Sequence, residues 1–161
     1  MARRIIKWDQ KIRLFWKNYL IQTFMATLSI LILLISLHLQ NAIIIASIGA
    51  TAFIVFTMPQ DITAKPRSVI GGHFVGFACG ALCTLIPHSN LLATATVLAL
   101  AVGLSIFIMV VIDTEHPPAS GTALGIAMTG YSPSALISVV TSVIVLSLLH
   151  QLLKPHLKNL V

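Results

Sequence analysis

Long apolar runs, separated by short polar breaks, organise this chain between residues 20 and 153. A helix needs roughly 20 mostly apolar residues to cross a bilayer, and four runs approach or exceed that length. They cover residues 20–39, 67–86, 91–112 and 133–153. A fifth run, 42–58, follows the first after only Gln40 and Asn41, which predicts a tight helical hairpin. The sixth, 119–128, is too short to cross by itself, because about 12 residues of helix cover only about 18 Å.

This pattern predicts an all-α, polytopic membrane helix bundle with about six membrane segments, one of them short or broken. The composition supports that class. Of the 161 residues, 57% are hydrophobic and 9% are charged, whereas soluble domains carry about 25% charged residues. So few charges cannot cover the surface of a water-soluble fold of this size. We therefore expect an integral membrane protein with one domain.

The basic residues concentrate ahead of the first apolar run. Six of the ten precede it: Arg3, Arg4, Lys7, Lys11, Arg13 and Lys17. Aromatic side chains lie among them, at Trp8, Phe15, Trp16 and Tyr19. This mixture favours a basic amphipathic helix over residues 1–19 at the membrane interface, before a transmembrane domain over residues 20–161. Lys and Arg gather on the cytoplasmic side of short loops, so the charge indicates topology rather than a nucleic-acid partner.

The same rule orients the segments. With a cytoplasmic N-terminus, Lys65 and Arg67 are cytoplasmic, and so are Lys154 and Lys158 if the run 119–128 crosses the membrane. If this run re-enters instead, the C-terminal lysines lie outside. The rule favours crossing and a cytoplasmic C-terminus. So short a run completes a crossing only if it starts below the membrane surface.

Two polar breaks resemble each other: "AKPRSVIGGH" at 64–73 and "EHPPASGTALG" at 115–125. In each, proline fits the first turn of a following helix, where its missing N–H costs nothing. Free backbone N–H groups and the positive end of a helix dipole favour anions, and broken helices that point such ends at a substrate recur in transporters. We therefore interpret the second break as a binding site or gate. An ordinary cytoplasmic turn capped by Asp113 and Glu115 is the alternative interpretation.

The candidate substrate-binding residues come from both breaks. They are Lys65, Pro66, Arg67, Ser68, Gly71, Gly72, His73, His116, Pro117, Pro118, Ser120, Gly121 and Thr122. His73 and His116, with the two acids of the second break, are candidates for a gate or for proton coupling, since ionisable residues inside spans are functional by default. A packed His73 that bonds to a neighbouring carbonyl is the alternative. We expect Asp113 and Glu115 to pair with Lys65 or Arg67 and so bridge the breaks.

Smaller features bear on the same site. Ser47 and Thr51 share one face of the second run, where their hydroxyls can donate to a passing anion or to their own helix. Pro66 and Pro118 are 52 positions apart, which hints at a duplicated helix pair. The chain lacks HExxH and GxSxG motifs and any cluster of metal ligands. We therefore expect no enzyme activity, no metal and no cofactor.

At "HPPASGTALG" the chain resembles the HPP family of integral membrane proteins, and "SIGATAFIVF" followed by "AKPRSVIGGH" strengthens the resemblance. It covers roughly residues 42–130. It implies a compact all-helical membrane domain, which in some members precedes cytoplasmic CBS domains. Plant and cyanobacterial members are associated with nitrite transport. Lys65 stands where the family usually has Gln, and Glu115 where it usually has Leu, so the two charges are expected to compensate.

Together these features predict a transporter of a small inorganic anion, with nitrite as the first candidate, in a bacterial inner membrane. Arg67 and Lys65 would attract the anion, the two helix starts would hold it, and His73 and His116 would donate hydrogen bonds to it. About 160 residues is little protein to enclose a pathway, so a homo-oligomer is expected. A passive anion channel and a membrane sensor or scaffold that moves no anion are the alternatives.

Overall fold

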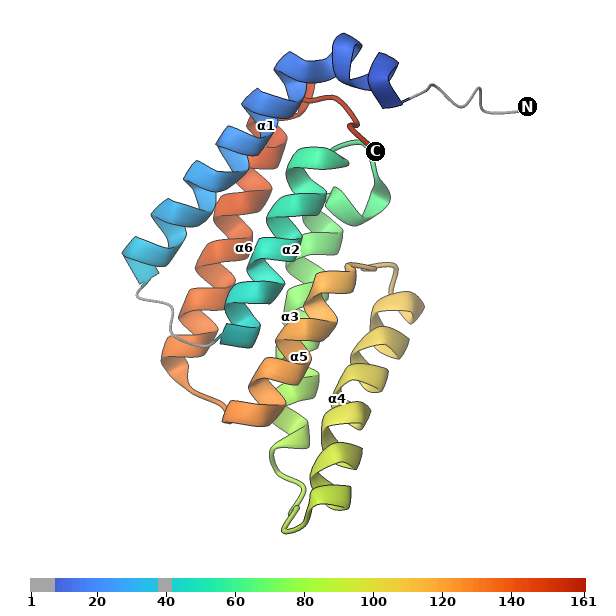
Figure 1. Ribbon diagram of the computed structural model, residues 1–161. Coiled ribbons are helices and arrows are strands. Elements are labelled where there is room, and N and C mark those ends of the chain that lie inside the picture. Colours follow the sequence, from blue (N-terminus) through green and yellow to red (C-terminus); the bar gives the residue numbers. More distant parts are fainter. Residues whose placement is uncertain (1–7, 38–41) are drawn as a thin grey trace, which may run out of the picture.

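The computed structural model describes residues 8–37 and 42–161, which fold into six α-helices joined by short connections (Figure 1). The α-helices are α1 Trp8–Leu37, α2 Ala42–Thr57, α3 Pro66–Cys83, α4 Leu91–Val111, α5 Pro117–Thr129 and α6 Pro133–Leu153. Two 3₁₀ turns complete the described elements, η1 Ile62–Ala64 and η2 Lys154–His156. The described ranges contain no strand, and the prediction of an all-α fold is confirmed.

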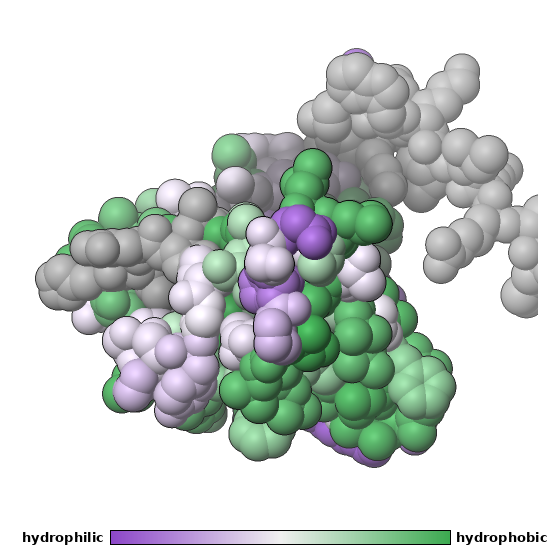
Figure 2. Space-filling model, turned by 90° about the horizontal axis from the view of Figure 1, so that it is seen from below, coloured by the Kyte–Doolittle hydropathy of each residue, from purple (hydrophilic) through white to green (hydrophobic). Residues whose placement is uncertain are grey.

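Helix length and surface character confirm a helical membrane bundle. Three helical stretches are long and apolar enough to cross a bilayer: Arg13–Leu37, Leu91–Val111 and Pro133–His156. Large apolar side chains are exposed on the surface of the bundle, and Phe24, Phe74 and Phe107 are each about two-thirds exposed. A soluble protein rarely exposes apolar surface on this scale. Figure 2 views the end of the bundle away from the chain termini, where hydrophobic atoms surround a small hydrophilic area.

Residues 8–37 form one continuous helix, α1, which includes most of the stretch predicted to lie at the membrane interface. α1 runs without interruption for 30 residues, because residues 8–37 contain neither proline nor glycine to end it. In Figure 1 its first turns bend across the end of the bundle. Several predicted features lie outside the described residues, namely Arg3, Arg4, Lys7 and the hairpin turn at Gln40 and Asn41.

α3 is the central helix, and it contacts α4, α5 and α6. α3 and α5 run side by side in the same direction, with Gly72 against His116 and Gly80 against Ala123. Because Gly72 lies six residues after Pro66, α5 begins about 9 Å farther along the bundle than α3, at 1.5 Å per residue. A helix of only 13 residues thereby ends level with α3. This offset agrees with the prediction that so short a segment has to start below the membrane surface.

Close packing between α3 and α5 depends on small residues. A Cβ atom added to Gly76 would overlap the backbone carbonyl oxygen of Ala119. One added to Gly80 would lie 2.6 Å from the carbonyl oxygen of Ala123. Membrane helices pack by direct contact rather than by the hydrophobic effect, so such close approach is a main source of their association.

Both ends of the described chain meet at the same end of the bundle, as six crossings require (Figure 1). Gln22 of α1 is buried there and donates from Nε2 to the carbonyl oxygens of Phe56 and Lys158. The backbone N–H of Leu160 donates to Thr57 O at 2.8 Å. These bonds tie α1, the end of α2 and the C-terminal segment together.

We predict that Gly76→Ala lowers the free energy of unfolding by about 1–3 kcal/mol, because the new methyl group has to push α5 away from α3. Thermal unfolding of the purified protein in detergent measures this loss. Gly103→Ala is the matched control, since a Cβ at Gly103 meets nothing within 4 Å. Equal melting temperatures for the two variants would contradict the close α3–α5 contact.

Candidate functional site

The two polar breaks meet in the folded chain. A Cβ on Gly71 would lie 2.8 Å from Thr114 Cγ2, and one on Gly72 would lie 2.8 Å from His116 Cβ. The rings of His73 and His116 are therefore neighbours, with centroids 5.1 Å apart and planes tilted by 50°. Both side chains are fully buried. Two of the predicted site residues that lie 43 positions apart thus form one pair inside the bundle.

A single hydroxyl group joins the two imidazoles. Thr51 Oγ1 of α2 lies 2.8 Å from His73 Nε2 and 2.9 Å from His116 Nε2. It also lies 3.0 Å from the carbonyl oxygen of Ser47 in its own helix. The sequence left open whether this hydroxyl faces a ligand or its own helix, and in this structure its partners are the two histidines and its own helix.

Each histidine also has a partner on its other ring nitrogen. His73 Nδ1 lies 2.8 Å from Thr122 Oγ1, which lies 2.9 Å from Ser47 Oγ. Ser47 in turn donates to Pro118 O at 2.5 Å. His116 Nδ1 donates to the carbonyl oxygen of Thr63 at 2.8 Å. Ser47, Thr51, His73, His116 and Thr122 therefore form a continuous buried network, which we call the histidine cluster.

The connection between α2 and α3 positions the carbonyl group that His116 needs. Asp61 is the N-cap of η1, and its Oδ1 accepts from Thr63 N at 2.9 Å and from Thr63 Oγ1 at 2.8 Å. These two hydrogen bonds lower the pKa of Asp61. Neither Asp61 nor Thr63 is among the predicted site residues. The Asp-x-Thr spacing is a recognisable capping signal, although it does not reveal which side chain will use the Thr63 carbonyl.

The basic residues lie at the edge of this site rather than in it. Lys65 and Arg67 are exposed, and Arg67 Nη2 donates to Ile112 O at 2.9 Å. That carbonyl belongs to the C-terminal end of α4, where helix carbonyls lack intrahelical donors. The start of α3 is thereby tied to the end of α4 through backbone rather than through an acidic side chain.

The expected ion pairs between the breaks are not formed. In the described part of the chain, neither Asp113 nor Glu115 bonds to Lys65 or Arg67, and Glu115 Oε2 is buried without a hydrogen-bond partner. The two acids do not cap α5 either, because His116 is its N-cap and makes no side-chain cap bond. Asp113 instead occupies the tight turn after α4 with a φ of 54°, a left-handed conformation that Asp tolerates better than most residues.

The start of α5 also has fewer free backbone N–H groups than the predicted anion site at a helix start. Pro117 and Pro118 have no N–H group, and the N–H of Ala119 already donates to His116 O at 2.9 Å. A helix start normally leaves four free N–H groups, and here two are absent and a third is used. The physical reason is the double proline itself, which favours a helix start and at the same time removes its donors.

The other predicted residues have distinct positions. Gly121 packs against Ser47 of α2, with a Cβ position 3.4 Å from Ser47 Cβ. Ser68 is buried in the first turn of α3. Ser120 lines a groove of about 370 Å³ between α4 and α5. The groove is lined by Ile106, Met109, Val110, Glu115, His116, Pro117 and Ser120.

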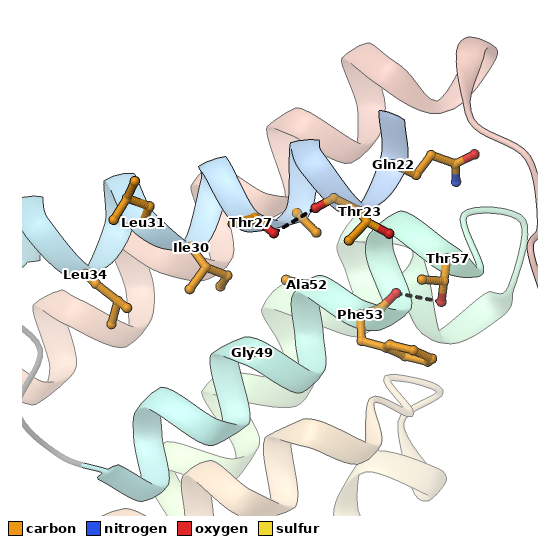
Figure 3. A pocket seen from close by; sticks show the side chains of 11 residues that line it. Gln22, Thr23, Thr27, Ile30, Leu31, Leu34, Gly49, Ala52, Phe53 and Thr57 are labelled. Atoms are coloured by element: carbon orange, nitrogen blue, oxygen red, sulfur yellow. Dashed lines mark hydrogen bonds between the residues drawn. The ribbon is translucent and has the colours of Figure 1, made fainter. Parts of the chain in front are cut away.

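Two further cavities lie between helices of the bundle. One of about 200 Å³ lies between α3 and α6, and His73 is its only ionisable lining residue. The other, of about 650 Å³, lies between α1 and α2 and contains none of the predicted site residues (Figure 3). The hydroxyls of Thr27 and Thr57 in that groove donate to their own helices, at 2.9 Å and 2.8 Å. The histidine cluster thus lies between a groove that contacts His116 and a cavity that contacts His73.

Comparison with known proteins identifies the chain's relatives. The family model described as "HPP, transmembrane region" matches residues 12–159. A transmembrane protein of Dictyostelium discoideum is 35% identical over 89 residues, which are 55% of this chain and 31% of the relative. A second transmembrane protein of that organism is 29% identical over 90 residues, 56% of this chain and 29% of the relative. The aligned part therefore spans less than a third of these relatives. No solved structure matches the chain significantly.

We predict that Thr122→Val lowers the free energy of unfolding by about 1–3 kcal/mol, because buried polar groups at Ser47 and His73 lose their shared partner. Thr122→Ser keeps the hydroxyl and is expected to retain most of the stability. Thr96→Val is the control, since its exposed hydroxyl bonds only to Leu92 O in its own helix. Thermal unfolding in detergent ranks the three variants, and a Thr122→Val protein as stable as Thr96→Val would argue against the network.

Proposed function

Because the chain belongs to the HPP family of transmembrane proteins, we propose that it transports a small inorganic anion, with nitrite as the first candidate. The observation that carries the proposal is the buried pair of His73 and His116, held where two helix breaks converge inside a membrane bundle. Ionisable side chains at such positions are expensive to bury and mark transport paths by default. The association of plant and cyanobacterial family members with nitrite supports the choice of anion.

Within this proposal, each part of the site has a separate task. Lys65 and Arg67, exposed at the start of α3, raise the local concentration of anions. The imidazole and hydroxyl groups of the histidine cluster replace part of the water shell of the anion as it passes. Since these groups bond to one another in this structure, the transport cycle requires α5 to shift against α3 so that donors become free.

Arg67 acts at the entrance in this mechanism. Its guanidinium bonds to Ile112 O, so it closes the junction between α3 and α4 while it is bound there. An arriving anion competes for the same N–H groups, and charge-assisted bonds to an anion are stronger than a bond to a neutral carbonyl. Anion binding would therefore release the junction.

The cellular setting belongs to the same proposal. The basic residues ahead of the first membrane segment favour cytoplasmic chain ends in a bacterial inner membrane. A homo-oligomer would supply the protein surface that 161 residues lack for enclosing a path. We propose no chemical reaction and no cofactor for this domain. The proposal concerns this chain alone, because the aligned stretch covers less than a third of each curated relative.

We predict that purified protein in liposomes takes up nitrite, and that Arg67→Ala lowers the initial rate about tenfold, equivalent to about 1.4 kcal/mol in activation free energy. Lys17→Ala is the control, because it removes an exposed charge from α1, far along the chain from the breaks. Uptake is measured with and without a pH gradient, after subtraction of nitrous acid diffusion into protein-free liposomes.

The outcomes separate the candidate functions. Uptake that depends on the protein and responds to the pH gradient supports a proton-coupled transporter, and uptake that follows the nitrite gradient alone supports a passive channel. Uptake no faster than in empty liposomes would exclude nitrite and favour a sensor or scaffold. An Arg67→Ala rate equal to that of Lys17→Ala would remove Arg67 from the mechanism.

A further inference from the structure

The hydrogen atoms that the histidine cluster has available for hydrogen bonds can be counted. Seven bonding distances, of 2.5–3.0 Å, join its side chains to one another and to the carbonyl oxygens of Ser47, Thr63 and Pro118. Each such contact needs one hydrogen. A hydroxyl group carries one hydrogen, and so does a neutral imidazole. With both histidines neutral, five hydrogens serve seven contacts, and two contacts have none.

The geometry also selects the tautomer of each neutral ring. Thr63 O only accepts, so His116 carries its hydrogen on Nδ1 and its Nε2 must accept from Thr51. Thr51 has then used its one hydrogen, so His73 donates to it from Nε2. The Nδ1 of His73 consequently accepts from Thr122. The two contacts left without hydrogen are Ser47 Oγ to Thr122 Oγ1 and Thr51 Oγ1 to Ser47 O.

An added proton fills one of these two contacts without any movement of heavy atoms. On His73, the proton makes Nδ1 a donor to Thr122, whose own hydrogen turns to Ser47 Oγ. On His116, it makes Nε2 a donor to Thr51, whose hydrogen turns to Ser47 O. Either form leaves fewer unsatisfied contacts than the neutral cluster. The contact between Ser47 and Thr122 is the more informative of the two, because helical threonines commonly make the i, i−4 contact that joins Thr51 to Ser47 O.

We propose that the histidine cluster is a binding site for one transferable proton, which His73 and His116 share through the hydroxyl group of Thr51. The site lies between two cavities, since His116 lines the groove that contains Glu115 and His73 lines the cavity between α3 and α6. The proton has a neighbouring carboxylate on the His116 side, where Glu115 Oε2 has no hydrogen-bond partner. The use of this proton in anion transport rests on the proposed function, whereas its binding does not.

The transfer between the rings balances. Starting with the proton on His73, the O–H bond of Thr51 breaks as an N–H bond forms on His116 Nε2. The Nε2–H bond of His73 breaks at the same time, and its hydrogen restores the hydroxyl of Thr51. His116 is then the cation, and His73 keeps its remaining hydrogen on Nδ1, where it donates to Thr122. One proton has moved, and every atom has its ordinary valence.

Few other charges surround the pair. The helices α2 and α4 contain no titratable residue, and α6 contributes only His150, which donates from Nε2 to Pro59 O at 2.9 Å. The connection before α5 contributes Asp113 and Glu115, and the start of α3 contributes Lys65 and Arg67, both exposed. The remaining groups are Asp61, which bonds to Thr63, and the thiols of Cys79 and Cys83 in α3. Glu115 alone among the acids shares a groove with His116.

We predict the protonation pattern of the full chain in lipid nanodiscs containing ¹⁵N-labelled histidine, observed by solid-state NMR without nitrite. At neutral pH, His73 should carry hydrogen on Nε2 and His116 on Nδ1. On acidification, the signals of both rings should change in one step that corresponds to one added proton. Replacement of each histidine by Gln assigns the signals.

Substitutions of Thr51 distinguish a relay from a structural contact. Thr51→Ser keeps the hydroxyl and should preserve the joint step, whereas Thr51→Val should separate it into independent changes. Proton entry into liposomes under an imposed voltage, followed with a pH-sensitive dye in the presence and absence of nitrite, should fall severalfold in Thr51→Val and remain near normal in Thr51→Ser.

Three results would overturn the proposed proton site. The first is an unprotonated Nδ1 on His116 at neutral pH. The others are rings that titrate separately in the unaltered protein, and no protonation of either ring while the protein stays folded. A joint step in Thr51→Val would show that Thr51 does not transfer the proton. Because the NMR experiment contains no nitrite, its result stands apart from nitrite uptake. A joint step with no uptake would keep the proton site and reject the proposed anion.

Discussion

Two imidazole rings without access to water need a partner for each ring nitrogen, and the centre of this protein is arranged around that requirement. An unsatisfied polar group within a membrane costs several kcal/mol. Thr51 supplies a partner to both rings at once, while Thr122 and the Thr63 carbonyl complete their outer sides. These groups come from α2, α5 and the η1 turn, so one polar cluster fixes the relative positions of four segments.

The same requirement explains the small residues on α3. His116 reaches Thr51 only if the start of α5 lies directly against α3, and a Cβ atom at Gly72 would lie only 2.8 Å from His116 Cβ. Farther along, Gly76 and Gly80 keep the two helices at that short distance. The hydrogen bonds of the histidine cluster and the close packing of α3 against α5 therefore support each other. A change in either would disturb the other, as expected where coupled contacts fail to behave additively.

Much of the fold follows from local pattern, whereas the site depends on tertiary geometry. The apolar runs predicted all six helices, because membrane helices need long apolar stretches, and Pro66 and Pro117 mark their helix starts as prolines should. The convergence of His73 with His116 could be suspected from the similarity of the two breaks. The role of the Thr63 carbonyl could not be predicted, because every residue has a backbone carbonyl and the sequence does not show which one a distant side chain will contact.

The expectations that the structure contradicts also depended on tertiary geometry. Opposite charges at Lys65 and Glu115 suggested a pair, but side-chain direction decides pairing, and Arg67 found a free carbonyl at the end of α4 instead. The double proline correctly predicted a helix start, yet its missing N–H groups weakened the anion site inferred from that start. α1 is continuous through residues 8–37, since no residue in it breaks the helix, and the position of residues 1–19 at the membrane interface stays a prediction.

The late start of α5 has an electrical consequence. A membrane voltage falls across the low-dielectric part of a membrane protein, and moving one elementary charge through 100 mV involves about 2.3 kcal/mol. Since α5 spans only 13 residues, about 20 Å at 1.5 Å per residue, it is shorter than a typical hydrocarbon core of about 30 Å, and its start lies within the region where the voltage falls. Because Gly72 packs against His116, His73 and His116 lie at nearly the same depth, and a proton that passes between the two rings crosses little of that voltage.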